Sequence, residues 1–307
     1  MYPNSEQAAS IRNALLIALK DYNPEILLNS EITSVDRKDN KFITSLYENR
    51  KLKKLEFDKI IIATGLGAAP KLGSDASFLP LLLKLEIKYN KYLPALCALE
   101  LDKREFFKTV TGVRAKGEIS VYIDGERIAG DFGELQFCDN GISGIPTFQI
   151  SRYVSRALDK GKKVTVKTDI FSHIGDVKEI INERKKIFKP ETLGDFGNGL
   201  INSKLWLGIL KLAKKNPENK FKICDEKDWN DIIKACKNME FKVLKTADFD
   251  KCQVCTGGIP LKKLDSNLMY KDIRNLYFAG EIIDVDGICG GYNLQWAWTS
   301  GYIAGNA

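Results

Sequence analysis

Two short apolar segments, each ending in small residues, place the strongest constraint on the fold of this chain. Residues 60–63 (IIIA) are continuously apolar and run into Thr64-Gly65. Residues 276–279 (LYFA) repeat this pattern and run into Gly280-Glu281. A strand that is buried on both faces of a parallel sheet has this composition, because none of its side chains faces water. The sequence therefore predicts an α/β protein, and ligands of open α/β sheets bind at the carboxyl ends of such strands.

A glycine pair, Gly290-Gly291, precedes a predicted helix over residues 293–304. A glycine-lined helix N-terminus offers free backbone N–H groups and the positive end of a dipole to an electron-rich ligand atom. The carboxylates of Glu281, Asp284 and Asp286 lie between the second strand and this helix. Carboxylates suit the hydroxyls of a sugar or ribityl chain, whereas they repel a phosphate. These residues indicate a nucleotide-cofactor site, and an ordinary glycine-rich loop is the alternative.

The residue pattern changes near residue 101, and 307 residues are enough for about two domains. Short strands broken by glycines dominate residues 101–175 and 239–254, whereas helical periodicity dominates residues 176–238. We therefore predict one α/β domain that is interrupted by an insert domain. The predicted limits are residues 1–100 and 255–307 for the α/β domain and residues 101–254 for the insert.

Local periodicity predicts individual elements. Residues 5–20 predict a helix with Ser5 as its N-cap, because apolar residues recur at helical spacing. Residues 151–158 predict a further helix, and the alternation on both sides of Asp39-Asn40 predicts a β-hairpin. The segments predicted as strands are residues 25–28, 32–37, 41–47, 54–57, 110–113, 118–123, 126–128, 134–137, 163–168 and 241–244.

Charge and reactive side chains exclude several kinds of site. Lys and Arg exceed Asp and Glu by 47 − 40 = 7 and are spread along the chain, which indicates a solvated surface. The 7 cysteines indicate reduced thiols, and we expect Cys252 and Cys255 to be a strand-borne pair without chemistry. His173 is the only histidine, so we expect no metal site and no histidine-dependent triad unless His173 is the one base. No apolar stretch approaches the ~18 residues of a membrane span, and we expect a cytoplasmic protein.

The C-terminal residues 280–305 (GEIIDVDGICGGYNLQWAWTSGYIAG) resemble the signature of a bacterial FAD flavoprotein family. This family comprises aminoacetone oxidase-like and dehydro-bile-acid reductase-like NAD(P)/FAD-dependent oxidoreductases. Further elements of the chain resemble the family in the same order. They are residues 2–8 (YPNSEQA), 63–65 (ATG), 132–144 (FGELQFCDNGISG) and 256–260 (TGGIP).

The resemblance implies a two-dinucleotide-binding-type FAD domain that is interrupted by a β-barrel plus helical insert. It also implies a flavin-dependent oxidoreductase that transfers hydride to or from a small organic substrate, with NAD(P)H or oxygen as redox partner. It assigns no catalytic residue, and we expect neither a nucleic-acid nor a membrane partner. The residues implied to hold FAD form three groups. They are Ala63, Thr64 and Gly65 at its nucleotide half; Gly280, Glu281, Asp284 and Asp286 at its ribityl and pyrophosphate region; and Gly290, Gly291, Tyr292, Asn293, Leu294 and Gln295 at the pyrimidine edge of the flavin.

One family element has no counterpart in these 307 residues. The family begins with a βαβ unit that carries G-x-G-x-x-G, and the nearest match here, residues 65–70 (GLGAAP), lacks the third glycine. We therefore expect an N-terminally truncated FAD domain: a fragment, a start assigned to an internal methionine, or a lost pyrophosphate site. This chain alone is expected to bind FAD weakly or not at all. The alternatives are a flavin-free fragment or scaffold without activity, and a nucleic-acid-associated flavoprotein.

Overall fold

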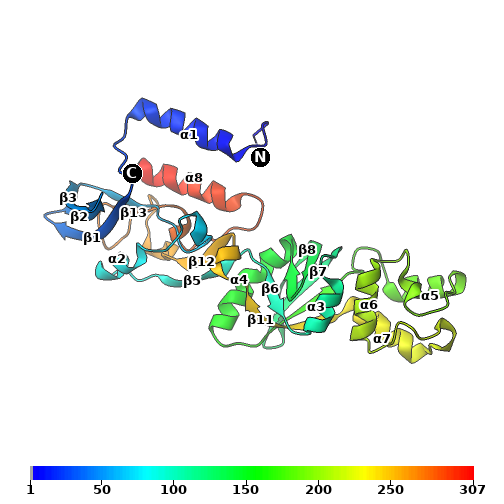
Figure 1. The fold of residues 1–307 in the computed structure, drawn as a ribbon. Coiled ribbons are helices and arrows are strands. Elements are labelled where there is room, and N and C mark those ends of the chain that lie inside the picture. Colours follow the sequence, from blue (N-terminus) through cyan, green and yellow to red (C-terminus); the bar gives the residue numbers. More distant parts are fainter. Residues whose placement is uncertain (1–2) are drawn as a thin grey trace.

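The computed structural model describes residues 3–307 as a mixed α/β protein. Tyr2, part of the predicted element at residues 2–8, lies outside the described residues. The arrangement is elongated, with α1 and α8 near one end and α5 and α7 at the other (Figure 1). Two large apolar clusters lie along it, one drawn from residues 35–97 and 252–283 and one from residues 99–243.

The first part of the chain forms a helix and an antiparallel sheet. Helix α1 (Ala8–Tyr22) is followed by strands β1 (Ser30–Lys38), β2 (Lys41–Glu48) and β3 (Lys51–Phe57), in the sheet order β1-β2-β3. The predicted hairpin is confirmed, because β1 and β2 pair in antiparallel register up to Lys38 and Lys41. Asp39 and Asn40 make the turn with φ of 50° and 66°, a left-handed conformation that Asp and Asn tolerate.

Strand β4 (Ile60–Ile62) pairs in parallel with β13 (Leu276–Phe278), so the two segments that predicted an α/β fold lie side by side. β13 is buried throughout, but Ile61 in the middle of β4 is 44% exposed. The expectation that residues 60–63 are buried on both faces is therefore wrong for β4. In the described residues these two strands form a sheet of their own, and Ile61 lines a cavity together with side chains of the β1-β2-β3 sheet.

Two predictions near the N-terminus are wrong. Helix α1 begins at Ala8 with Gln7 as its N-cap, and the hydroxyl of Ser5 instead contacts the hydroxyl of Ser10 at 2.6 Å. Residues 25–28 form no strand, and their apolar side chains Ile26 and Leu28 are 61% and 73% exposed. A strand requires a neighbour for its backbone groups, and none of the described strands lies beside this segment.

The middle of the chain contains a closed barrel with strand order β10-β11-β6-β9-β8-β7. Helix α4 (Ile145–Asp159) packs on the barrel and buries Ile150, Val154 and Ala157 in the larger cluster. The barrel strands are β6 (Leu99–Leu101), β7 (Arg114–Ile123), β8 (Glu126–Cys138), β9 (Gly141–Ser143), β10 (Val164–Asp169) and β11 (Met239–Thr246).

Two strand predictions in this region are corrected. Residues 110–113 form no strand, because Val110 ends helix α3 (Arg104–Val110), whose Phe106 and Phe107 are buried in the larger cluster. Residues 126–128 and 134–137 belong to the single long strand β8, which pairs with β7 along its length.

Three helices extend the barrel end of the molecule: α5 (Val177–Ile187), α6 (Ser203–Leu212) and α7 (Glu226–Lys237). Each begins with a side-chain cap, because Asp176, Asn202 and Asp225 accept a hydrogen bond from a backbone N–H of the first turn. Trp206 of α6 is fully buried among them, and its ring N–H donates to the carbonyl of Leu193 at 2.9 Å.

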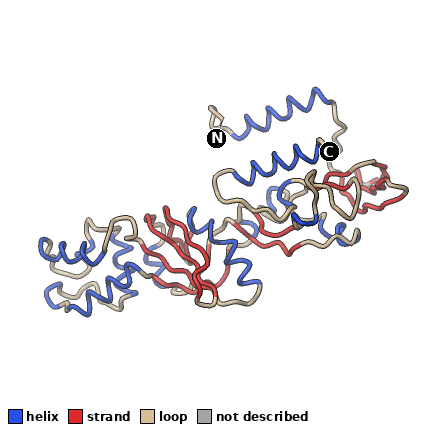
Figure 2. Tube along the Cα trace, turned by 180° about the vertical axis from the view of Figure 1, so that it is seen from behind, coloured by secondary structure: helices blue, strands red, loops and turns tan. Residues whose placement is uncertain are grey.

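The remaining elements connect the barrel with the C-terminus. Helix α2 (Leu79–Lys84) precedes β5 (Asn90–Ala95), which pairs antiparallel with β12 (Val254–Gly258). Helix α8 (Tyr292–Gly305) is the last helix, and both views draw it below α1 (Figures 1 and 2). Among residues 3–307, no helix combines the length and the apolar character that crossing a bilayer requires.

Helices α1 and α8 expose much of their apolar surface. α1 has no buried residue, and only Ser300 and Ala304 of α8 are buried. The exposed apolar side chains include Leu15, Leu16 and Ile17 of α1 and Leu294, Trp298 and Tyr302 of α8.

Candidate functional site

A cavity of about 360 Å³ lies at the N-terminus of α8 and is called the α8 cavity here. Five residues predicted to hold the cofactor line it: Glu281, Gly290, Gly291, Asn293 and Leu294. Its volume is at the lower end of the range that small-molecule sites occupy. The other lining residues are Leu96, Gln253, Val254, Val285, Ile288, Cys289, Trp296 and Ala297.

The N-terminus of α8 has unpaired backbone donors. Its N-cap Gly291 has a φ of 91°, and no side chain caps the helix. The first hydrogen bond at this end joins the N–H of Gln295 to the carbonyl of Gly291 at 3.0 Å. Within residues 3–307, the N–H groups of Tyr292, Asn293 and Leu294 have no hydrogen-bond acceptor. Such groups require a partner, and with the helix dipole they favour an anionic or electron-rich ligand atom.

Glu281 joins the two predicted strand ends. Its Oε1 accepts a hydrogen bond from the N–H of Cys255 at 2.7 Å, and its Oε2 lies 3.6 Å from the position that a Cβ on Gly65 would take. Burial raises the pKa of Glu281 above its usual value, and the N–H groups of Cys255 and Leu66 partly oppose this shift. Glu281 therefore provides a carboxyl group at one wall of the α8 cavity, beside Gly65.

Glu281→Gln is expected to stabilise the protein near neutral pH. A carboxyl pKa that is raised on folding makes ionisation disfavour the folded state, and this penalty grows as pH rises through the folded pKa. Glutamine keeps an oxygen that accepts from the N–H of Cys255 and cannot ionise. Urea unfolding is expected to show a higher free energy of unfolding for the variant near neutral pH and no difference below about pH 4. A less stable variant near neutral pH would mean that the two N–H groups outweigh burial.

Asp284 and Asp286 hold their loop and do not line the α8 cavity. Asp284 accepts from the N–H of Gly257 at 3.1 Å and from the side-chain amide of Asn90 at 2.7 Å. Oδ1 of Asp286 accepts from the hydroxyl of Thr256 at 3.1 Å, and its Oδ2 lies 2.9 Å from Nη1 of Arg152. Burial raises the pKa of Asp286, and the Arg152 guanidinium opposes this shift. Contact of these carboxylates with a ribityl chain stays a prediction.

The other predicted cofactor residues do not line the α8 cavity. The N–H of Gly280 donates to the hydroxyl of Ser300 at 2.8 Å, and its carbonyl accepts from the ring N–H of Trp296 at 3.1 Å. Tyr292 and Gln295 are exposed on the first turn of α8. Their roles, like those of Ala63, Thr64 and Gly65, stay predictions.

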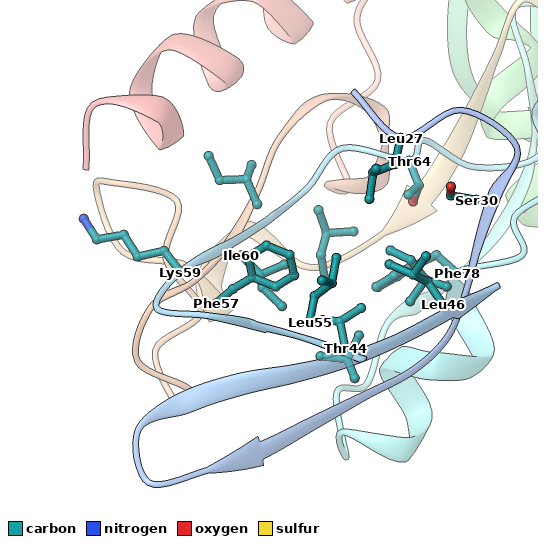
Figure 3. A pocket seen from close by; sticks show the side chains of 14 residues that line it. Leu27, Ser30, Thr44, Leu46, Leu55, Phe57, Lys59, Ile60, Thr64 and Phe78 are labelled. Atoms are coloured by element: carbon teal, nitrogen blue, oxygen red, sulfur yellow. The ribbon is translucent and has the colours of Figure 1, made fainter. Parts of the chain in front are cut away.

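Thr64 lines a second cavity of about 350 Å³, which is largely apolar and lies between β4 and the β1-β2-β3 sheet (Figure 3). Leu46, Leu55 and Phe57 contribute from this sheet, and Phe78 lies next to α2. Thr64 is exposed beside this cavity rather than beside the α8 cavity. The two predicted strand ends therefore face different cavities, with Gly65 and Glu281 as their point of contact.

No sequence pattern indicated the three side chains of α4 that contact the loop before α8. Oε1 of Gln149 accepts from the N–H of Cys289 at 3.0 Å, and Arg152 donates to the carbonyl of Gly287 at 2.7 Å. Arg156 donates to the Asp286 carboxylate at 3.2 Å. These residues are more than a hundred positions away from their partners along the chain, and no local pattern connects the two.

The reactive side chains outside this loop are buried or isolated. Cys252 and Cys255 are free and buried, and only Cys255 lies in β12. A hydrogen bond with Cys252, together with burial, raises the pKa of Cys255. His173 packs beside Phe132 with ring centres 6.0 Å apart. Over residues 3–307, the structure has no group of three or more His, Cys, Asp or Glu side chains that could hold a metal ion.

The full chain is similar to a reductase. It is 33% identical over 310 residues to the Clostridium scindens protein named 3-dehydro-bile acid delta(4,6)-reductase, covering 100% of this chain and 75% of the relative. Two more distant relatives are both named ribosomal RNA dihydrouridine synthase. The Haemophilus influenzae protein is 27% identical over 97% of this chain and 72% of its own length. The Escherichia coli protein is 24% identical over 97% of this chain and 71% of its own length.

A family match covers the same extent. The family described as HI0933-like protein Rossmann domain matches residues 1–307. This match and the 33% identical reductase confirm the resemblance to dehydro-bile-acid reductase-like proteins that the sequence motifs indicated. The aminoacetone oxidase-like part of that resemblance stays a prediction. The chain belongs to the HI0933-like Rossmann family.

Proposed function

We propose that this protein is an FAD-dependent oxidoreductase that transfers hydride between the flavin and a small organic substrate. The observation that carries the proposal is the N-terminus of α8, whose unpaired N–H groups adjoin the α8 cavity. Full-length similarity to a reductase supports it. FAD would supply the hydride chemistry, so the protein would need no catalytic histidine.

The residues around the α8 cavity fit the electron-rich edge of a flavin. Gly290 and Gly291 carry no Cβ, so a flat ring can approach the backbone closely. The dipole of α8 and the N–H groups of its first turn would stabilise negative charge at that edge. Glu281 would hold the turn at Gly65 beside the site through its contacts with Cys255 and Leu66.

The names of the relatives narrow the proposed substrate class. A delta(4,6)-reductase and a dihydrouridine synthase both add hydrogen across a carbon–carbon double bond. We therefore propose reduction of an unsaturated organic substrate as the reaction of this chain, with NAD(P)H as the source of hydride. Oxygen, the other redox partner considered, only accepts electrons and would serve the opposite reaction, in which the flavin oxidises the substrate. The higher identity to the bile-acid enzyme favours a small molecule over RNA.

The RNA alternative rests on the two more distant relatives and predicts a different measurement. An RNA substrate would bind through phosphate contacts, and its affinity would fall steeply with salt concentration. Binding of ribosomal RNA with such a salt dependence, together with flavin, would favour the nucleic-acid-associated flavoprotein. A protein without flavin affinity would favour the scaffold without activity.

Titration with FAD and with riboflavin tests the proposed site. These 307 residues contain no G-x-G-x-x-G run to hold a pyrophosphate. The helix N-terminus that follows such a run, with its dipole, would contribute up to ~2 kcal/mol to binding of the pyrophosphate. We therefore expect both ligands to bind with micromolar or weaker dissociation constants that differ by less than about tenfold. Fluorescence titration of the purified chain measures both values.

The two ligands separate the outcomes. Binding of neither ligand at millimolar concentration would overturn the flavin proposal. Sub-micromolar binding of FAD with weak binding of riboflavin would show that these residues hold the pyrophosphate, and the expectation of a weak site would be wrong. Similar weak binding of both ligands would support a site that recognises the flavin ring.

A further inference from the structure

Helix α4 presents one polar face to the loop that leads into α8. Gln149, Arg152 and Arg156 follow one another at helical spacing, so their side chains extend from the same side of α4. On another side, Ile150, Val154 and Ala157 are buried in the cluster that contains the barrel strands. The polar face is therefore attached to the barrel, although the loop that it contacts follows β13.

Arg152 makes the central contacts of this face. Its guanidinium donates to the carbonyls of Asp286 and Gly287, and it pairs with the Asp286 carboxylate at 2.9 Å. The side chains of Arg152 and Asp286 are only 13% and 7% exposed. A planar guanidinium can serve several acceptors at once, which an ammonium group cannot do in the same geometry.

Three further side chains extend the contact along the loop. Arg156 and Thr256 both donate to Oδ1 of Asp286. Gln149 accepts from the N–H of Cys289, the residue directly before Gly290. The loop is thus bound to α4 from Asp286 to Cys289, and the next residues, Gly290 and Gly291, line the α8 cavity.

We propose that Arg152 is a positioning residue: from α4 it holds residues 286–289 in the conformation that presents the N-terminus of α8 to the cofactor. The inference rests on the proposed function, because the positioned site is the flavin site. It assigns α4 a role in cofactor affinity although none of its residues lines the α8 cavity. A shift of the barrel relative to β13 would therefore change the flavin site through Arg152.

The test uses the complete 307-residue chain and two readouts. Arg152→Met is expected to speed hydrogen exchange of the hydrogen-bonded amides of Gly287 and Cys289 at least tenfold and to weaken FAD and riboflavin binding at least tenfold. Arg114→Met is the matched control, because Arg114 lies on the same barrel and pairs with Glu134 in an exposed ion pair at 3.0 Å. The control variant is expected to change neither readout.

Two milder variants keep the test decisive if Arg152→Met does not fold. Arg152→Lys keeps the charge beside Asp286 but cannot reach both carbonyls and the carboxylate at once, so intermediate exchange and intermediate affinity are expected. Gln149→Ala removes only the acceptor for the N–H of Cys289 and is expected to speed exchange at that amide.

The outcomes distinguish this inference from the proposed function. Unchanged exchange at the amides of Gly287 and Cys289 in Arg152→Met, or in Arg152→Lys if Arg152→Met does not fold, would overturn the positioning role, with or without a cofactor. Faster exchange with unchanged flavin affinity would overturn the link to the cofactor. Failure of the unaltered chain to bind either flavin would overturn the proposed function first, and the exchange readout would still decide whether Arg152 holds the loop.

Discussion

Gly291→Val is expected to abolish flavin binding at millimolar ligand while the barrel stays folded. Gly291 lines the α8 cavity, and a Cβ placed on it would meet no atom of the chain within 4 Å. Valine would therefore occupy space that the proposed flavin ring requires, without clashing with the protein. The φ of 91° adds backbone strain of about 1–2 kcal/mol, because L-residues disfavour the left-handed conformation.

Gly125→Val separates the loss of ligand space from the backbone strain. Gly125 lies in the β7–β8 turn with a φ of 92°, and a Cβ there would also meet no atom within 4 Å. Both variants are therefore expected to lose similar stability in thermal unfolding, whereas only Gly291→Val loses flavin in titration. Full flavin affinity in Gly291→Val would remove this loop from the cofactor site. Equal losses of affinity in both variants would attribute the effect to general destabilisation.

The parts of the fold that the sequence predicted correctly depend on local chemistry. The β1–β2 hairpin forms because Asp39 and Asn40 accept left-handed φ values between two alternating segments. The helix after Gly290-Gly291 forms because glycine accepts the φ of its N-cap. Residues 25–28 and Val110 have strand-like side chains, but the first segment pairs with none of the described strands and Val110 ends a helix packed on the barrel. Tertiary neighbours, which no local pattern specifies, decide these cases.

The candidate site likewise contains residues that local sequence predicts and residues whose roles depend on partners far away in the chain. Glu281, Gly290 and Gly291 were predictable because strand, loop and helix follow one another directly in sequence. The role of Asp286 could not be predicted, because its charge is balanced by Arg152. Arg152 lies 134 positions earlier in the chain and also binds the backbone carbonyl of Asp286. Carboxylates in a loop look available for a ligand until their partners are known. The prediction that Asp284 and Asp286 bind ribityl hydroxyls therefore competes with the internal contacts of these two side chains.

The second large effect concerns the domain organisation. We propose that the chain consists of an α/β domain and, within it, an insert that has its own core. Gly258→Ala is expected to disrupt the α/β part alone. Gly258 has a φ of 113°, and a Cβ on it would overlap the carbonyl oxygen of Ile282, which lies in the cluster of residues 35–97 and 252–283. Backbone strain and overlap together are expected to destabilise this cluster by roughly 3 kcal/mol or more.

Gly141→Ala is the converse change, because a Cβ on Gly141 would overlap the carbonyl oxygen of Leu99 where β9 pairs with β6 in the barrel. If the two clusters fold as separate units, hydrogen exchange should speed up over residues 60–62 and 276–278 in Gly258→Ala and over the barrel strands in Gly141→Ala. Each variant should leave the other cluster protected, since local unfolding proceeds in cooperative units. Loss of protection over the whole chain in both variants would show one cooperative unit. The contacts of α4 with the loop at 286–289 would then link the two clusters in stability as well as in position.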